Sequence, residues 1–298
     1  MVKVISAVKE MQERAGELRR GNRRIACVPT MGFLHDGHLS LMRMARQAAD
    51  SLVVSIFVNP AQFGPGEDFE TYPRDLDRDL GLCAHENVDI VFTPETAALY
   101  PEGYQSYVKL EHLPHHLCGL SRPVFFTGVA TVVCKLFNIV RPHSAVFGEK
   151  DYQQLLIIRR MVKDLNFNID IIGAPIVREK DGLAMSSRNA YLKPGQRPAA
   201  LTLYRSLVQA TRRVETGERD ATRILQEARD LIAVQPETEI DYLSICDPES
   251  LVAVACIDRP ALMALAVKVG KTRLIDNTIL PGSSSEVRSI AVDFDKPA

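Results

Sequence analysis

Residues 28–41 read VPTMGFLHDGHLSL, and this stretch decides how the chain folds. The residues just before and within its start, 25–28, are apolar and typical of a buried strand, while residues 29–37 carry the proline and glycines of a turn. From His38 onward, apolar side chains recur at helical spacing, at Leu41, Met44, Ala45 and Ala48. This pattern predicts a strand, a glycine-bearing loop and an amphipathic helix.

The junction between this loop and helix is a predicted anion site. A helix start presents unpaired N–H groups and the positive end of the helix dipole. Gly32 and Gly37 would let an anion approach the backbone closely, and His35 and His38 are spaced to face the same anion. Two histidines near a helix start also occur on ordinary surfaces, so the pair alone leaves both interpretations open. The strand and the two glycines around it favour the anion site.

The tetrapeptide at residues 35–38, HDGH, resembles the HxGH signature of the nucleotidyltransferase superfamily that includes class I aminoacyl-tRNA synthetases. The longer run PTMGFLHDGHLSL resembles the pantoate-β-alanine ligase family. The resemblance extends over roughly residues 1–280, because three further motifs follow in the family's order. They are SIFVNPAQF at 55–63, FGEKDYQQL at 147–155 and GLAMSSRN at 182–189.

Composition limits the classes of protein that remain. The chain has 298 residues, more than one typical domain, so we expect two domains or one large domain with an appendage. Its 36 basic and 37 acidic residues leave a net charge of −1 without a long run of either sign. A nucleic-acid partner is therefore not expected, since nucleic-acid binders need a basic surface to replace counterions.

Cysteine usage and hydropathy predict a cytoplasmic protein without membrane contact. The N-terminal residues 1–20 lack the apolar core of a signal peptide, and the apolar stretch 251–269 is interrupted by two charged residues and a proline. The cysteines show no CxxC spacing, which favours free thiols in a reducing compartment. They are Cys27, Cys83, Cys118, Cys134, Cys246 and Cys256.

The predicted fold class is α/β, with a Rossmann-like parallel sheet of the nucleotidyltransferase type and a smaller C-terminal α+β lid domain. We expect the nucleotide- and pantoate-binding domain at 1–182, the lid at 183–282 and a polar tail at 283–298. A first helix is predicted over residues 1–20 and a short strand at 106–110. Further strands are predicted at 52–58, 88–92, 144–147, 169–177, 239–246, 262–269 and 273–275, and helices at 75–86 and from Gly128, after 151, and around 200–208 and 224–232.

Two amides follow the strand predicted at 52–58. Asn59 and Gln62 would leave the sheet at its carboxyl edge, where parallel sheets bind ligands. Uncharged amides bind hydroxyl and carboxylate oxygens, although Asn-Pro can also simply start a turn. The family resemblance implies that both bind pantoate, with Gln62 also near β-alanine.

Two later segments add positive charge. Residues 148–151, GEKD, repeat the order of strand, glycine, charged loop and helix, so Lys150 can reach a polyphosphate and Asp151 a ribose. Ser186, Ser187 and Arg188 combine short donors with a guanidinium fork, as in an anion clamp, and resemble the superfamily's KMSKS-type loop. Each segment alone could equally be a solvated cap or polar loop.

The resemblance implies that ATP, (R)-pantoate and β-alanine give pantothenate, AMP and pyrophosphate through a pantoyl adenylate. His35, His38, Lys150 and Arg188 would be catalytic, ATP and Mg²⁺ the cofactors, Gln154 a pantoate ligand, and the protein a homodimer. The implied nucleotide-binding residues are Met31, Gly32, Phe33, Leu34, His35, Asp36, Gly37, His38, Gly148, Glu149, Lys150, Asp151, Val177, Met185, Ser186, Ser187 and Arg188.

Some residues stay open at this point. Asp79 is a possible magnesium ligand, but an acid on a helix face is more often solvated. His115 and His116 lack the further ligands of a structural metal site. The family pattern has Gly-His where this chain has Val124 and Phe125, so that histidine's role does not carry over.

Two rival functions also remain. An adenylyltransferase of the same superfamily would leave AMP attached to its product, whereas a non-catalytic nucleotide-binding module would not need Asn59, Gln62 and Gln154 beside the phosphate site.

Overall fold

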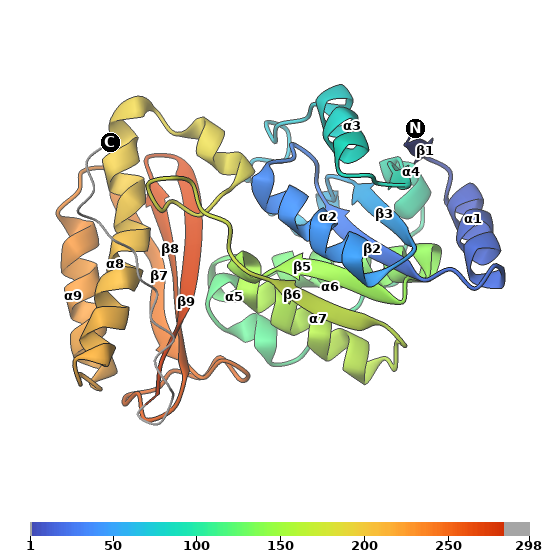
Figure 1. The fold of residues 1–298 in the computed structure, drawn as a ribbon. Coiled ribbons are helices and arrows are strands. Elements are labelled where there is room, and N and C mark those ends of the chain that lie inside the picture. The colour runs from blue at the N-terminus through green and yellow to red at the C-terminus, as the bar shows by residue number, and fades with distance from the viewer. Residues whose placement is uncertain (1, 283–298) are drawn as a thin grey trace.

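Short apolar runs build a parallel sheet in the N-terminal part of the computed structural model, which describes residues 2–282 (Figure 1). The strand order is β1-β4-β3-β2-β5-β6, and every neighbouring pair is parallel. The strands are β1 (Lys3–Ile5), β2 (Ile25–Thr30), β3 (Ser51–Ile56), β4 (Ile90–Phe92), β5 (Ser144–Gly148) and β6 (Asp170–Ala174).

The chain reverses direction across this sheet at β2. From β2 it moves outward through β3 and β4, and it then returns to place β5 on the opposite side of β2. Loops that follow β2 and β5 therefore leave the same edge in opposite directions. In open parallel sheets such a switch point is where ligands bind.

Helices cover both faces of the sheet, as predicted for an α/β fold. Successive strand residues point to opposite faces, so Cys27 packs in one apolar cluster while Ala26 and Val28 pack in the other. One face is covered by α1 (Val8–Arg20), α6 (Phe125–Val140) and α7 (Tyr152–Asp164), and the other by α2 (Asp36–Ala48) and α3 (Leu76–His85). Two short helices, α4 (Thr96–Leu99) and α5 (Cys118–Ser121), lie in the connections.

The C-terminal part has its own core. Two helices, α8 (Arg197–Glu215) and α9 (Ala221–Ala233), pack on an antiparallel sheet with the order β7-β8-β9 (Figure 1). These strands are β7 (Thr238–Cys246), β8 (Ala261–Val269) and β9 (Thr272–Leu280). The predicted helices followed by strands are confirmed, with a last strand longer than 273–275. The polar tail predicted at 283–298 lies outside the described residues.

Two local predictions were wrong. Residues 3–5 are not helical, because they pair with β4 as the outermost strand of the sheet. Residues 106–110 form no strand: the Val108 N–H donates instead to Thr131 Oγ1 at 3.0 Å, and no neighbouring strand in the described chain pairs with this segment. A β-prone sequence becomes a strand only when a partner supplies the other half of the hydrogen bonds.

All six cysteines are free thiols, and four of them are buried. No helix within residues 2–282 combines the length and the apolar character needed to span a membrane.

Candidate active site

A cleft of about 1250 Å³ lies between the carboxyl edge of the parallel sheet and the C-terminal part. Loops after β2, β3 and β5 contribute to its wall, and so do residues 185–188 and the turn between β8 and β9. Fifteen of the predicted site residues line it: Met31, His35, Gly37, His38, Asn59, Gln62, Gly148, Lys150, Asp151, Gln154, Val177, Met185, Ser186, Ser187 and Arg188.

The histidine loop, Lys150 and the serine loop at 186–188, all predicted to bind phosphates, meet in this cleft. Ser187 Oγ donates a hydrogen bond to the Phe33 carbonyl oxygen at 3.3 Å, across 154 positions of sequence. Burial is the main cause that lowers the pKa of His35 and of His38, and the Lys150 charge adds to it at both rings. The histidine loop, Lys150 and the serine loop therefore belong to one site.

The two histidines cap their own helix. His35 Nδ1 accepts from the Gly37 N–H at 3.2 Å, and His38 Nδ1 accepts from the His35 N–H at 3.3 Å. A nitrogen that accepts a backbone proton is unprotonated, so each neutral ring carries its proton on Nε2. A side chain at Gly37 would come within 2.8 Å of the His35 ring, so glycine is needed there. Both rings are thereby fixed as Nε2 donors at the cleft wall.

Burial keeps both rings neutral. It lowers the pKa of His35 to about 4, with the Lys150 charge as the next cause. Burial is also the main cause that holds the pKa of His38 well below its usual value. The electrostatic influence of His35 and then that of Lys150 lower it further. At neutral pH the pair thus offers two neutral hydrogen-bond donors, which suit an anion that is to be stabilised in place.

Asp79 is not the solvated acid that its place on a helix face made the common alternative. Its carboxylate is 1% exposed and accepts from the N–H groups of Phe33 (2.7 Å) and Leu34 (2.8 Å). Burial raises its pKa despite these two bonds. Gly32, at φ +80°, permits the approach, because a Cβ there would lie 3.0 Å from Asp79 Oδ2. Asp79 therefore fixes the loop that presents His35, and it is not solvated.

We expect Asp79→Asn to lower the free energy of unfolding by about 1–3 kcal/mol, because one amide oxygen replaces two acceptors and leaves a buried N–H unpaired. Urea denaturation followed by circular dichroism measures this loss. Asp77→Asn, on the exposed side of the same helix, is the matched control and should change stability little. Equal stability of both variants would contradict the assigned role of Asp79.

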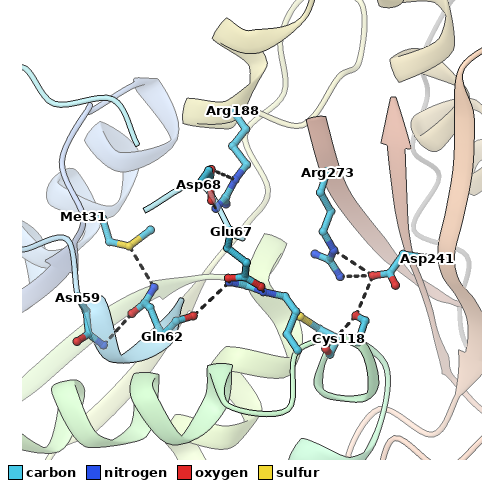
Figure 2. A network of polar contacts seen from close by, with 11 residues as sticks. Met31, Asn59, Gln62, Glu67, Asp68, Cys118, Arg188, Asp241 and Arg273 are labelled. Carbon is cyan, nitrogen blue, oxygen red and sulfur yellow. Dashed lines mark hydrogen bonds and ion pairs between the residues drawn. The ribbon is translucent and has the colours of Figure 1, made fainter. Parts of the chain in front are cut away.

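The two amides act as a unit, with Gln62 held in place by Asn59 (Figure 2). Asn59, 1% exposed, donates from Nδ2 to Gln62 Oε1 and to the Gly128 carbonyl, each at 3.1 Å. Gln62 Nε2 in turn donates to Met31 Sδ at 3.1 Å. Thioether sulfur is a weak acceptor, so a substrate oxygen would be a better partner for Gln62.

The sequence analysis missed several residues that organise the site. Asn277 in β9 donates to the carbonyl oxygens of Glu149 (3.0 Å) and Lys150 (2.9 Å), which ties the GEKD loop to the C-terminal sheet. Arg273 and Ser121 both donate to Asp241, which links that sheet to α5. Figure 2 shows the contact between Arg273 and Asp241. No local pattern marks these contacts, since each joins segments more than 30 positions apart.

The acidic pair Glu67 and Asp68 was also missed as part of the site. Each acid makes two hydrogen bonds to a different arginine of the cleft, Glu67 to Arg122 and Asp68 to Arg188. Arg122 also lies over the Phe125 ring, 3.9 Å from its centre, so the residue that replaces the family's histidine packs against an arginine.

Some predicted nucleotide-binding residues do not line the cleft. The Phe33 and Leu34 N–H groups donate to Asp79 and are therefore occupied in this structure. Asp36 is exposed at the first turn of α2. The predicted residues outside the cleft wall are Gly32, Phe33, Leu34, Asp36 and Glu149.

Within residues 2–282, no three His, Cys, Asp or Glu side chains gather as a metal site would require. His115 and His116 lie in the connection before α5, and neither lines the cleft.

Comparison with known proteins gives a consistent result. Residues 3–279 match the family model described as pantoate-beta-alanine ligase. The chain is 58% identical to the pantothenate synthetase of Syntrophobacter fumaroxidans over 279 residues, covering 94% of this chain and 99% of that protein. The Desulfatibacillum aliphaticivorans pantothenate synthetase is also 58% identical, with the same coverage.

Solved structures agree with the sequence relatives. The crystal structure of pantothenate synthetase from Thermus thermophilus matches with a TM-score of 0.89 at 43% identity, covering 94% of this chain and all of that one. The ligase from Francisella tularensis, solved with beta-gamma ATP and beta-alanine, matches with a TM-score of 0.78 at 31% identity, covering 94% and 98%. The chain shares both the fold and the length of these enzymes.

Proposed function

The chain belongs to the pantoate-β-alanine ligase family, and from this premise we propose how its cleft condenses (R)-pantoate with β-alanine. The enzyme is an AMP-forming ligase that consumes ATP and releases pyrophosphate. The observation that carries the proposal is that His35, His38, Lys150 and the two amides of Gln62 and Gln154 line one cleft. This places phosphate-binding and hydroxy-acid-binding groups within reach of one another.

The first step joins the pantoate carboxylate to the α-phosphorus of ATP and breaks the bond to pyrophosphate. The Nε2–H donors of His35 and His38 would bind the α-phosphate oxygens as negative charge develops there. Lys150, Arg188 and the hydroxyls of residues 186–187 would hold the β- and γ-phosphates and the leaving pyrophosphate. No protein nucleophile is needed, because the substrate carboxylate itself attacks.

In the second step the β-alanine amine attacks the acyl carbon of the adenylate, forming the amide bond while AMP leaves. Water would destroy this adenylate, so the cleft has to be closed. We propose that residues 1–182 and 183–282 are two domains and that the second closes over the first. The separate apolar cores of the two sheets support this division.

We propose that Mg²⁺ enters with ATP. Since the described residues offer no ready metal cluster, the phosphates would supply most of its ligands, as is common for Mg²⁺ with nucleotides. When bound, the ion would neutralise phosphate charge.

We further propose a cytoplasmic homodimer. The family resemblance implies the dimer. A second copy could cover the β-prone residues 106–110, which pair with no strand within residues 2–282 and in which Tyr107 is 60% exposed. Light scattering of the purified enzyme should give twice the monomer mass.

Exchange of labelled pyrophosphate into ATP tests the first step. It should require pantoate and should not require β-alanine, and other 2-hydroxy acids should support it poorly. Free AMP should accumulate only when β-alanine is added, which separates this ligase from an adenylyltransferase. Exchange without pantoate, or none with it, would contradict the proposal.

Gln62→Ala should raise KM for pantoate by about tenfold or more while KM for ATP changes less than twofold, because a lost hydrogen bond to a charged group is worth about 1.5–3 kcal/mol. Steady-state kinetics with each substrate varied in turn measures both constants. Gln153→Ala is an instructive comparison: that glutamine binds backbone groups near α5 and should reduce stability instead. An equal rise in both KM values for Gln62→Ala would argue against a pantoate-specific role.

A further inference from the structure

Two consecutive acids, Glu67 and Asp68, hold two different arginines of the cleft. Glu67 accepts from Arg122 Nε at 2.7 Å and from its Nη2 at 2.6 Å. Asp68 accepts from Arg188 Nε at 2.9 Å and from its Nη2 at 2.8 Å. Both pairs are two-point contacts, which fix the plane of a guanidinium as well as its position.

The two arginines serve different regions of the cleft. Arg122 Nη2 also donates to the Gln62 carbonyl oxygen at 3.2 Å, so it is bound to the backbone of the residue proposed to bind pantoate. Arg188 lies in the serine loop proposed to bind phosphates, 120 positions from Asp68 in the sequence. Figure 2 shows Arg188 bound to Asp68, and Gln62 with Asn59 and Met31 as a separate group.

Each acid occupies only one edge of its arginine. Among the described residues, Arg188 Nη1 has no hydrogen-bond partner, and the side chain is about a quarter exposed at the cleft. The Asp68 carboxylate therefore leaves donors available for a phosphate while it fixes where they point. Burial favours the neutral acid, but the hydrogen bonds from Arg188 outweigh it and lower the pKa of Asp68. The carboxylate is thus charged at neutral pH.

Glu67 is in the same condition. Burial favours its neutral form, and the hydrogen bonds and charge of Arg122 outweigh burial and lower its pKa. Arg122 is confined further by the Phe125 ring beneath it. Because Glu67 and Asp68 are adjacent on one segment, a single stretch of chain sets the positions of both arginines.

We propose that Glu67 and Asp68 are positioning residues that serve the two substrates separately. Asp68 orients Arg188 toward the phosphates of ATP. Glu67 orients Arg122, which holds the backbone carbonyl of Gln62 and so orients Gln62 toward pantoate. The inference rests on the proposed function, since it assigns the arginines to those substrates. It adds a division of labour between two neighbouring acids, neither of which contacts a substrate.

Matched isosteric variants, Asp68→Asn and Glu67→Gln, test this division. Asp68→Asn should weaken ATP binding by about tenfold, within the range for coupled neighbours, and leave KM for pantoate within twofold. Glu67→Gln should do the reverse, raising KM for pantoate by about tenfold and leaving ATP affinity within twofold. ATP affinity is measured by isothermal titration calorimetry without pantoate, so this readout does not depend on turnover.

A double-mutant cycle shows whether Asp68 acts through Arg188. In an Arg188→Ala background, Asp68→Asn should cause no further loss of ATP affinity. With Arg188 present, Asp68→Glu should lose less ATP affinity than Asp68→Asn, because it keeps a carboxylate. Tighter ATP binding in Asp68→Asn would overturn the proposal, because it would make the carboxylate a competitor of the phosphates. Parallel effects of both acids on both substrates would overturn it as well, by indicating a merely structural segment.

These outcomes are distinct from a failure of the proposed function. If the wild-type enzyme did not bind ATP or form pantothenate, the assignment of the cleft would be wrong. If it did both and the two variants lacked the crossed pattern, only the roles of Glu67 and Asp68 would be wrong.

Discussion

His38→Ala is expected to lower kcat by about 10² to 10⁴, the range for removal of a positioned proton donor. His38 lines the cleft and carries its proton on Nε2, because its Nδ1 accepts from the His35 N–H. Without it, charge developing on the α-phosphate loses a donor that is already in place. Steady-state turnover and pantoate-dependent pyrophosphate exchange should fall together.

His38→Asn separates catalysis from helix capping. An asparagine oxygen can accept the His35 N–H in place of Nδ1, but it offers no group where Nε2 lies. This variant should keep the stability of the wild type and remain as slow as His38→Ala, whereas His115→Ala, on an exposed histidine, should be fully active. An active His38→Asn enzyme would reduce His38 to a helix cap.

The protonation state of His35 and His38 predicts how kcat/KM depends on pH. Burial lowers the pKa of His35 to about 4 and that of His38 well below its usual value, so neither ring of the free enzyme gains a proton between pH 8 and 6. We therefore expect kcat/KM for ATP to show no inflection near pH 6.5.

Lys150→Ala should lower kcat/KM for ATP by about 10² to 10³, comparable to the loss of one preorganised donor to a developing anion. Lys150 lines the cleft, and Asn277 fixes its backbone from the C-terminal sheet. Lys163 is an exposed lysine late in α7, and Lys163→Ala changes the net charge by the same amount as Lys150→Ala. This control variant should have wild-type kinetics. A loss shared by both variants would point to general electrostatics.

Local sequence patterns predicted the elements that carry the chemistry. The strand, loop and helix around His35 and His38 follow from apolar spacing and two glycines, and the segment around Lys150 repeats them. These patterns depend on residues within a few positions of each other, so they can be interpreted without the fold. The same logic failed at 106–110, where β-prone residues find no strand to pair with in the described chain.

The sequence by itself therefore determined which side chains are available to bind a nucleotide and a hydroxy acid, and on which kinds of element they lie. Only the tertiary structure decided how they meet. The reversal of strand order at β2 sets β5 beside it and so brings Lys150 to the histidines. Pairings such as Asp68 with Arg188 and Ser187 with Phe33 join residues more than 100 positions apart, and no local periodicity encodes contacts that arise only when separate elements pack.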